Sequence, residues 1–178
     1  MSGMLAVRIN AADHILGQVT APVSLVEYGD YQCPACAAAY PIVHEVLEQN
    51  EEGLCFVFRH FPLSQVHPLA QMAAQVAEVA DTMRKFWDMH DWLYVNQPVW
   101  TRAGAAGIAL GARKLGITPT AMQRALENQT IAEHVRQDFM GGVRSGVNGT
   151  PSFFINGRLH AGGYDTLADA VALAFETG

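Results

Sequence analysis

The chain has 178 residues, of which half are hydrophobic and 16% charged, and its 11 basic and 17 acidic residues give a net charge of −6. This length and composition predict a folded protein with one sizeable core rather than a disordered chain. Scattered basic residues and short apolar runs argue against a nucleic-acid binder and against a membrane span of roughly 20 residues.

The N-terminal stretch Met1–Asn10 has no basic segment followed by an apolar run, so it does not look like a secretory signal. We therefore expect a cytoplasmic protein if the chain is complete, and a periplasmic or otherwise exported one if a signal peptide has been removed. The three cysteines are too few for a disulfide scaffold, and their number is odd.

The first third of the chain predicts a strand, a helix and a second strand. Val23–Tyr28 is a short, mostly apolar run typical of a buried strand. A helix is expected to begin near Pro34, where a missing N–H costs nothing, and to be kinked at Pro41. Leu54–Phe61 is rich in aromatic and β-branched residues and predicts a second strand, central in its sheet.

Residues 67–146 show apolar stripes at helical spacing, which predict four or five helices. One of these helices should stop before Pro98. Thr118-Pro119 matches an N-cap followed by a first-turn proline, and Thr130 with Glu133 matches a capping box.

The C-terminal segment returns to β-structure. Residues 152–160 predict a hairpin around Asn156-Gly157, because Asn-Gly supplies the positive φ angles of a type I′ turn. Asp165 can cap a last helix. The order β-α-β, helical block, β-β-α indicates an α/β fold. Since nothing resembles a linker, we expect one domain over residues 1–178, with an all-helical insertion at about 67–146.

Cys33 and Cys36 stand two residues apart at the junction of the first strand and its helix. Two cysteines at this spacing can close a disulfide across one helical turn. The N–H groups and the positive dipole end of a helix N-terminus favour a thiolate on the first sulfur. We therefore expect Cys33 to be an exposed nucleophile of low pKa and Cys36 to be a buried resolving thiol.

Two segments carry a family resemblance: residues 27–36 (EYGDYQCPAC) and residues 146–157 (GVNGTPSFFING). Together they resemble the DsbA-type branch of the thioredoxin superfamily, over nearly the whole chain and with its helical insertion. The resemblance implies a thioredoxin fold and a thiol–disulfide oxidoreductase without a cofactor. Its partners would be cysteine-containing proteins or peptides, and a redox protein or glutathione. We expect a monomer.

The resemblance also implies roles for particular residues. Cys33 and Cys36 match the redox pair, and Pro151 matches a cis-proline beside it. Thr150 would present its backbone for strand-like pairing with a bound peptide. Glu27 matches a buried acid that exchanges a proton with the second cysteine as a general base.

One residue departs from the pattern of the strongest oxidants in this branch. They carry histidine where this chain has Ala35, and alanine offers the Cys33 thiolate neither a hydrogen bond nor a charge. We expect a pair less oxidising than about −120 mV.

Structural interpretations of the same residues compete with the functional ones. A zinc site needs further ligands near the cysteines, and none is evident, so no metal is predicted. Cys55 is expected to be a core residue. Glu27 could be an exposed acid at a strand end. Asp30 and Tyr31 are expected to be solvated, and both His60 and His67 to be structural or hydrogen-bonded.

Two other functions remain open. One is a non-catalytic adaptor or chaperone on the thioredoxin fold. The other is a glutathione-linked transferase or isomerase on the related fold, which the intact cysteine pair disfavours. A disulfide isomerase is also less consistent with this chain, because such enzymes usually add a dimerisation domain.

Overall fold

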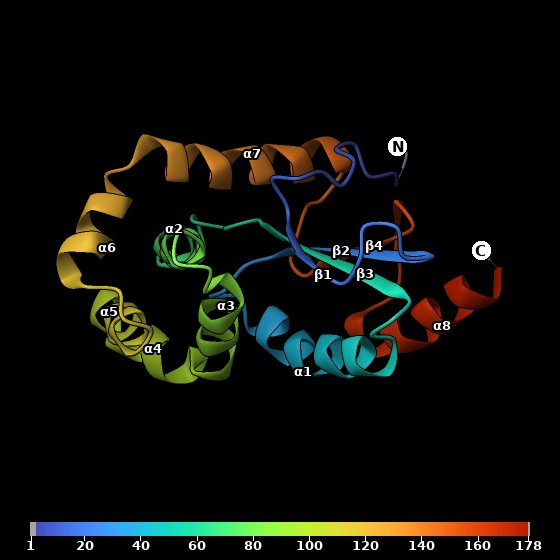
Figure 1. Ribbon diagram of the computed structural model, residues 1–178, viewed down its shortest axis with the longest axis horizontal. Coiled ribbons are helices and arrows are strands. Elements are labelled where there is room, and N and C mark those ends of the chain that lie inside the picture. Colours follow the sequence, from blue (N-terminus) through green and yellow to red (C-terminus); the bar gives the residue numbers. More distant parts are fainter. Residues whose placement is uncertain (1–2, 178) are drawn as a thin grey trace.

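The computed structural model describes residues 3–177, which form a five-stranded sheet with helices on both faces (Figure 1). The strands are β1 (His14–Leu16), β2 (Val23–Gly29), β3 (Leu54–His60), β4 (Ser152–Ile155) and β5 (Arg158–Leu159). The helices are α1 (Pro34–Gln49), α2 (Ala70–Asp81), α3 (Phe86–Val95), α4 (Gln97–Ala103), α5 (Ala105–Lys114), α6 (Pro119–Leu126), α7 (Gln129–Ser145) and α8 (Leu167–Thr177), with a 3₁₀ turn (Tyr164–Thr166) before α8.

The strand order is β1-β3-β2-β4-β5. β2 and β3 are parallel and joined through α1, whereas β4 pairs antiparallel with β2 and forms the predicted hairpin with β5. The fold is the α/β thioredoxin type. The second predicted strand is β3, and it lies inside the sheet as expected, because it pairs with β1 on one side and β2 on the other. The sequence analysis missed β1, which is only three residues long.

The segment between β3 and β4 contains six helices, α2 to α7, whereas the sequence predicts four or five. The additional helix is α4, which has Pro98 in its first turn, so this proline opens a helix as well as following the end of α3. The cap of α6 by Thr118 is as predicted. The cap of α7 is Asn128 instead of Thr130, since the Asn128 side chain accepts the Thr130 N–H. Asp165 lies inside the 3₁₀ turn and is not a helix cap.

The two faces of the sheet have separate cores. α1 and α8 cover one face, and α7 covers the other (Figure 1). Along β2, Leu25 belongs to the core on the α1 side, whereas Val26 and Tyr28 belong to the core on the α7 side. Cys55 is fully buried in the second core, which confirms the prediction that it is a core residue.

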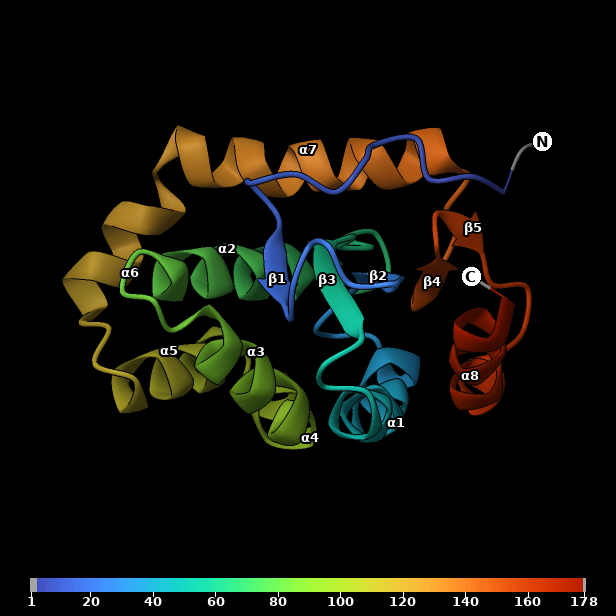
Figure 2. The same cartoon turned by 45° about the vertical axis from the view of Figure 1, so that its right-hand side comes forward.

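The N-terminal segment runs beside α7 before it enters β1 (Figure 2). The Leu5 N–H donates to the Gly157 carbonyl, and the Ala6 N–H donates to the Ser145 hydroxyl. The first two residues of the stretch considered above as a signal lie outside the described part of the chain. Within residues 3–177, no helix has the length and apolar character needed to cross a membrane.

Candidate redox site

The sheet brings the two predicted motifs together at one edge. β2 ends just before the Cys33 loop, and β4 begins beside that end because Tyr28 and Ser152 are antiparallel partners. The residues immediately before β4 therefore lie over the start of α1. The Thr150–Pro151 peptide bond is cis, and the Cys33 sulfur lies 3.3 Å from the Thr150 carbonyl oxygen.

Cys33 is the N-cap of α1, and Cys36 lies within its first turn. Cys36 is fully buried, as expected, but Cys33 is only 7% exposed, so the expectation of an exposed thiol is wrong. The Thr150 loop covers its sulfur on one side. On the backbone side, Gln97 of α4 donates to the carbonyls of Tyr31 (2.8 Å) and Cys33 (2.9 Å). Helix α4 thus holds the loop that carries the first cysteine.

The two thiols have opposite acidities. A hydrogen bond from the Cys36 thiol is the largest cause that lowers the Cys33 pKa to about 5, with Thr150 and the backbone of Cys36 and Ala35 adding to it against the effect of burial. Burial raises the pKa of Cys36 well above its usual value, and the neighbouring Cys33 and Glu27 raise it further. One sulfur is therefore a thiolate near neutral pH and the other a thiol.

Glu27 lies on β2 below these sulfurs. It is 3% exposed, so it is not an exposed acid at a strand end. Its neighbours in the sheet are Phe58 on β3 and Phe153 on β4, which give its carboxyl an apolar setting. Burial, followed by the charge of Cys33, raises the pKa of Glu27 to about 8.

Asp30 is buried, contrary to the expectation of a solvated loop residue. Its carboxylate accepts the N–H groups of Gln32 (2.8 Å) and Leu63 (2.9 Å) and pairs with His67 Nδ1 at 2.8 Å. The Asp30 N–H in turn lies 3.5 Å from the Cys36 sulfur. The segment after β3 covers this loop, and the Asp30 carboxylate accepts one N–H from the loop and one from that segment. His67 is hydrogen-bonded, as predicted.

Tyr31 was likewise expected to be solvated and is buried instead. Its hydroxyl lies 3.1 Å from His90 Nδ1, and its ring stacks on Phe58 and contacts Tyr94. Aromatic residues of α3 therefore enclose the Tyr31 side chain, which precedes the cysteine pair in sequence. The loop is rigidly packed on both sides.

A second buried polar centre lies away from the cysteines, between β1, β3, α2 and α7. Glu78 Oε1 contacts His14 Nε2 (2.6 Å) and His60 Nε2 (2.7 Å), and Glu78 Oε2 contacts His134 Nδ1 (2.8 Å). His60 is hydrogen-bonded, as predicted. His14, His60 and Glu78 each offer one ligand atom, and these three atoms lie within 4.8 Å of one another.

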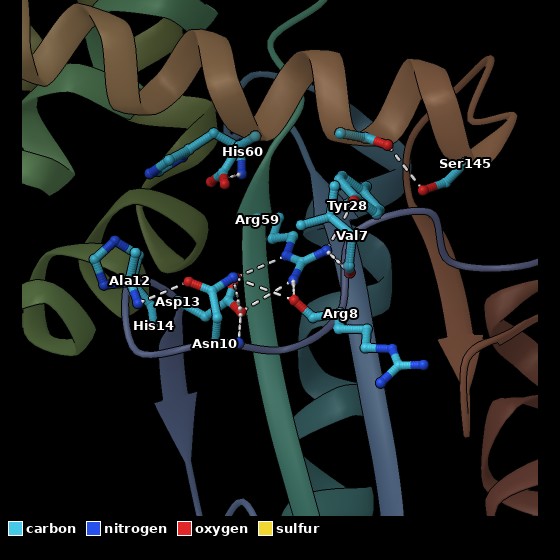
Figure 3. A network of polar contacts seen from close by, with 12 residues as sticks. Val7, Arg8, Asn10, Ala12, Asp13, His14, Tyr28, Arg59, His60 and Ser145 are labelled. Carbon is cyan, nitrogen blue, oxygen red and sulfur yellow. Dashed lines mark hydrogen bonds and ion pairs between the residues drawn. The ribbon is translucent and has the colours of Figure 1, made fainter.

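An ion pair adjoins this centre on β3. Buried Arg59 binds Asp13 and the carbonyls of Val7 and Arg8 (Figure 3). The sequence analysis missed both groups because their members are far apart in the chain. A signal was present: Arg59 and His60 close an otherwise apolar strand, and buried polar side chains need partners.

Comparisons with known proteins agree with this architecture. A family model described as thioredoxin matches residues 10–171. A curated relative, the Na(+)/H(+) antiporter NhaA 1 of Salinispora arenicola, is 41% identical over 165 residues, which cover 92% of this chain and 25% of the antiporter. This chain thus spans about a quarter of that relative's length.

Two solved structures are similar over nearly the whole chain. A thioredoxin-like oxidoreductase from Silicibacter pomeroyi is 27% identical, with a TM-score of 0.80 and 95% of each chain covered. The alpha-DsbA1 protein of Wolbachia pipientis shares the fold at 18% identity, with a TM-score of 0.77 and 99% of each chain covered. The chain belongs to the thioredoxin family.

Proposed function

We propose that this protein is a thiol–disulfide oxidoreductase that exchanges disulfides with cysteine-containing proteins or peptides through Cys33 and Cys36. The observation that carries the proposal is the contrast between the acidic thiol of Cys33 and the buried, weakly acidic thiol of Cys36 at the start of α1. A thiolate attacks disulfides and is also the better leaving group.

The chemistry runs in either direction through one mixed disulfide. As an oxidase, the Cys33–Cys36 disulfide is attacked at Cys33 by a substrate thiolate, which releases Cys36 as the leaving thiolate. A second substrate thiolate then attacks the substrate sulfur of the mixed disulfide and releases Cys33 as a thiolate. The substrate gains a disulfide, and the protein gains two electrons. As a reductase, Cys33 attacks a substrate disulfide and Cys36 resolves the intermediate.

Glu27 exchanges a proton with the buried sulfur of Cys36. When Cys36 leaves, protonated Glu27 gives it a proton, and when Cys36 attacks, the Glu27 carboxylate takes that proton back. A pKa raised to about 8 makes both forms accessible near neutral pH. In this proposal Thr150 and Pro151 position the substrate backbone over Cys33.

A groove of about 850 Å³ flanks the site, between the segment after β3 and α7. Its apolar lining includes Leu63, Val66, Val135 and Phe139. The groove adjoins the cysteine loop because the Leu63 N–H binds Asp30, and Asn148, two residues before Thr150, also lines it. We propose that it holds apolar side chains of an unfolded substrate and that residues 67–146 form an insertion within a single domain.

The compartment determines the net direction. An exported protein would meet reduced substrate thiols and act as an oxidase, whereas the cytoplasmic glutathione pool would keep the pair reduced and favour a reductase. Ion transport is not part of the proposal, because this chain corresponds to only a quarter of the antiporter relative.

The test is turnover of a cysteine-containing peptide by single-cysteine variants. Cys33→Ser should abolish exchange, whereas Cys36→Ser should accumulate a stable mixed disulfide detectable by mass. Cys55→Ala is the matched control, since Cys55 lies in the core on the opposite face of the sheet, and it should retain turnover. Full turnover by Cys33→Ser would contradict the proposal. Peptide binding without any turnover by the wild type would favour an adaptor.

A further inference from the structure

We propose that His14, His60 and Glu78 form a binding site for a divalent transition metal, with Zn²⁺ as the preferred ion. The site lies where β1, β3 and α2 meet, and it is separate from the cysteine pair. It is independent of the proposed redox function. Three ligand atoms lie close together there, and His134 holds the second oxygen of Glu78.

The ligand atoms come from three elements and lie within 4.8 Å of one another. The two Nε2 atoms lie 2.6 and 2.7 Å from Glu78 Oε1. Zinc binds imidazole nitrogen and carboxylate oxygen at about 2.0–2.2 Å, and tetrahedral ligand atoms then stand roughly 3.3 Å apart. Each nitrogen therefore needs to move away from the carboxylate oxygen by about 0.6–0.7 Å to admit the ion. Two histidines and a glutamate leave a fourth position for water.

Glu78 supplies the anionic ligand of the site. Glu78 is 5% exposed, and its ion-pair partners among the described residues are all histidines, with no lysine or arginine. The nearby Arg59 is already paired with Asp13.

The outer contacts hold the ligands in place. His134 binds the second oxygen of Glu78 at 2.8 Å, which leaves Oε1 to face the ion. The other ring nitrogen of His14 lies 3.8 Å from Asp81 Oδ1, and the His14 ring stacks on Phe86 at 3.4 Å between centroids. Carboxylates that orient metal-bound imidazoles are typical of such sites.

A small cavity lies beside the cluster on the α7 side. His134 is a quarter exposed, and it lines a cavity of about 220 Å³ together with Asp13 and Asp138. Figure 3 shows the region, with His14 on β1 and His60 on β3 near the Arg59–Asp13 pair. A bound ion would tie the N-terminal segment to the sheet and to α2.

The test measures zinc binding in a Cys33→Ser/Cys36→Ser background, so that the redox thiols cannot compete for the ion. The protein is stripped with a chelator and titrated with Zn²⁺ against a chromophoric competitor, and Co²⁺ spectra report the coordination. We expect one equivalent of Zn²⁺, tetrahedral or five-coordinate Co²⁺ without a sulfur charge-transfer band, and a thermal midpoint that rises on Zn²⁺ addition.

Glu78→Gln and His14→Gln should each weaken zinc binding at least about 100-fold. His44→Gln is the matched control, because His44 is an exposed histidine on α1 outside the cluster, and its binding should equal that of the background. His14→Gln lies on an edge strand and provides a second variant if Glu78→Gln does not fold. Less than a tenth of an equivalent bound by the background protein, or unchanged affinity in a folded cluster variant, would overturn the proposal and leave a purely hydrogen-bonded network.

Discussion

Two buried glutamates in this protein have pKa values that are shifted in opposite directions. Glu27 lies between phenylalanines under the cysteine pair, and burial raises its pKa to about 8. Glu78 is almost equally buried, yet hydrogen bonds from three histidines hold its pKa far below the usual range. Burial alone does not decide the charge of an acid. The donors that surround it decide whether it stays ionised.

The contrast separates a centre suited to chemistry from a centre suited to structure. An acid that titrates near neutral pH can accept and return a proton, as the exchange at Cys36 requires. An acid fixed in its ionised form by three partners joins β1, β3, α2 and α7. Substitutions at the two positions should therefore change stability in opposite directions.

The largest effect is expected for Glu78→Ala. Its removal leaves three buried or half-buried imidazoles without their acceptor, and breaking a buried charged pair costs about 3–5 kcal/mol. Urea unfolding of the metal-free protein should show this loss in the free energy of unfolding. Glu133→Ala on the exposed face of α7 is the control and should leave the free energy of unfolding nearly unchanged. A loss no greater than that of the control would contradict the account.

Glu27→Gln is expected to stabilise the reduced protein at pH 7. The folded pKa of about 8 exceeds the usual 4.5, so the folded state binds a proton that the unfolded chain has released. Stability from this group is complete below pH 4.5 and is lost as the pH rises through 8. The substitution should add up to about 3 kcal/mol at pH 7 and under about 1 kcal/mol at pH 5.

Unfolding curves of the wild type and Glu27→Gln at both pH values provide the measurement. The gain in stability should accompany a loss of exchange rate, because the variant cannot carry the Cys36 proton. Destabilisation at pH 7, or equal effects at the two pH values, would show that Glu27 is ionised in the folded protein.

The third effect is on the acidity of Cys33. Since the Cys36 thiol is the largest cause of its low pKa, Cys36→Ala should raise the Cys33 pKa from about 5 toward its usual value of 9. Cys36→Ser keeps a donor of similar size and should raise it less. The pH dependence of alkylation by iodoacetamide measures both. Equal pKa values in the two variants would assign the acidity to the helix terminus instead.

The smallest effect is expected for Ala35→His. A histidine between the cysteines would add a donor and a charge near the Cys33 thiolate, which stabilises the reduced form. About 1 kcal/mol of added stabilisation corresponds to roughly 20–30 mV, so the reduction potential should rise by that amount. A lower potential than that of the wild type would refute the argument.

The sequence predicts the site around the cysteine pair better than the polar centre around Glu78. The cysteine spacing, the strand before it and the Asn156-Gly157 turn are local signals, and the structure places them as predicted. The burial of Asp30 depends on Leu63 and His67, which local patterns do not connect to it. Likewise, His14 and Glu78 are 64 residues apart and meet only when β1 joins β3.

The central claim is that Cys33 and Cys36 form a reversible redox pair. The most direct measurement is its equilibrium reduction potential, titrated against glutathione and followed by mass. We expect a disulfide that forms and breaks at a potential between about −270 and −120 mV, since Cys33 is acidic but Ala35 adds no further stabilisation. If no Cys33–Cys36 disulfide forms at any ratio of oxidised to reduced glutathione, the redox assignment is contradicted.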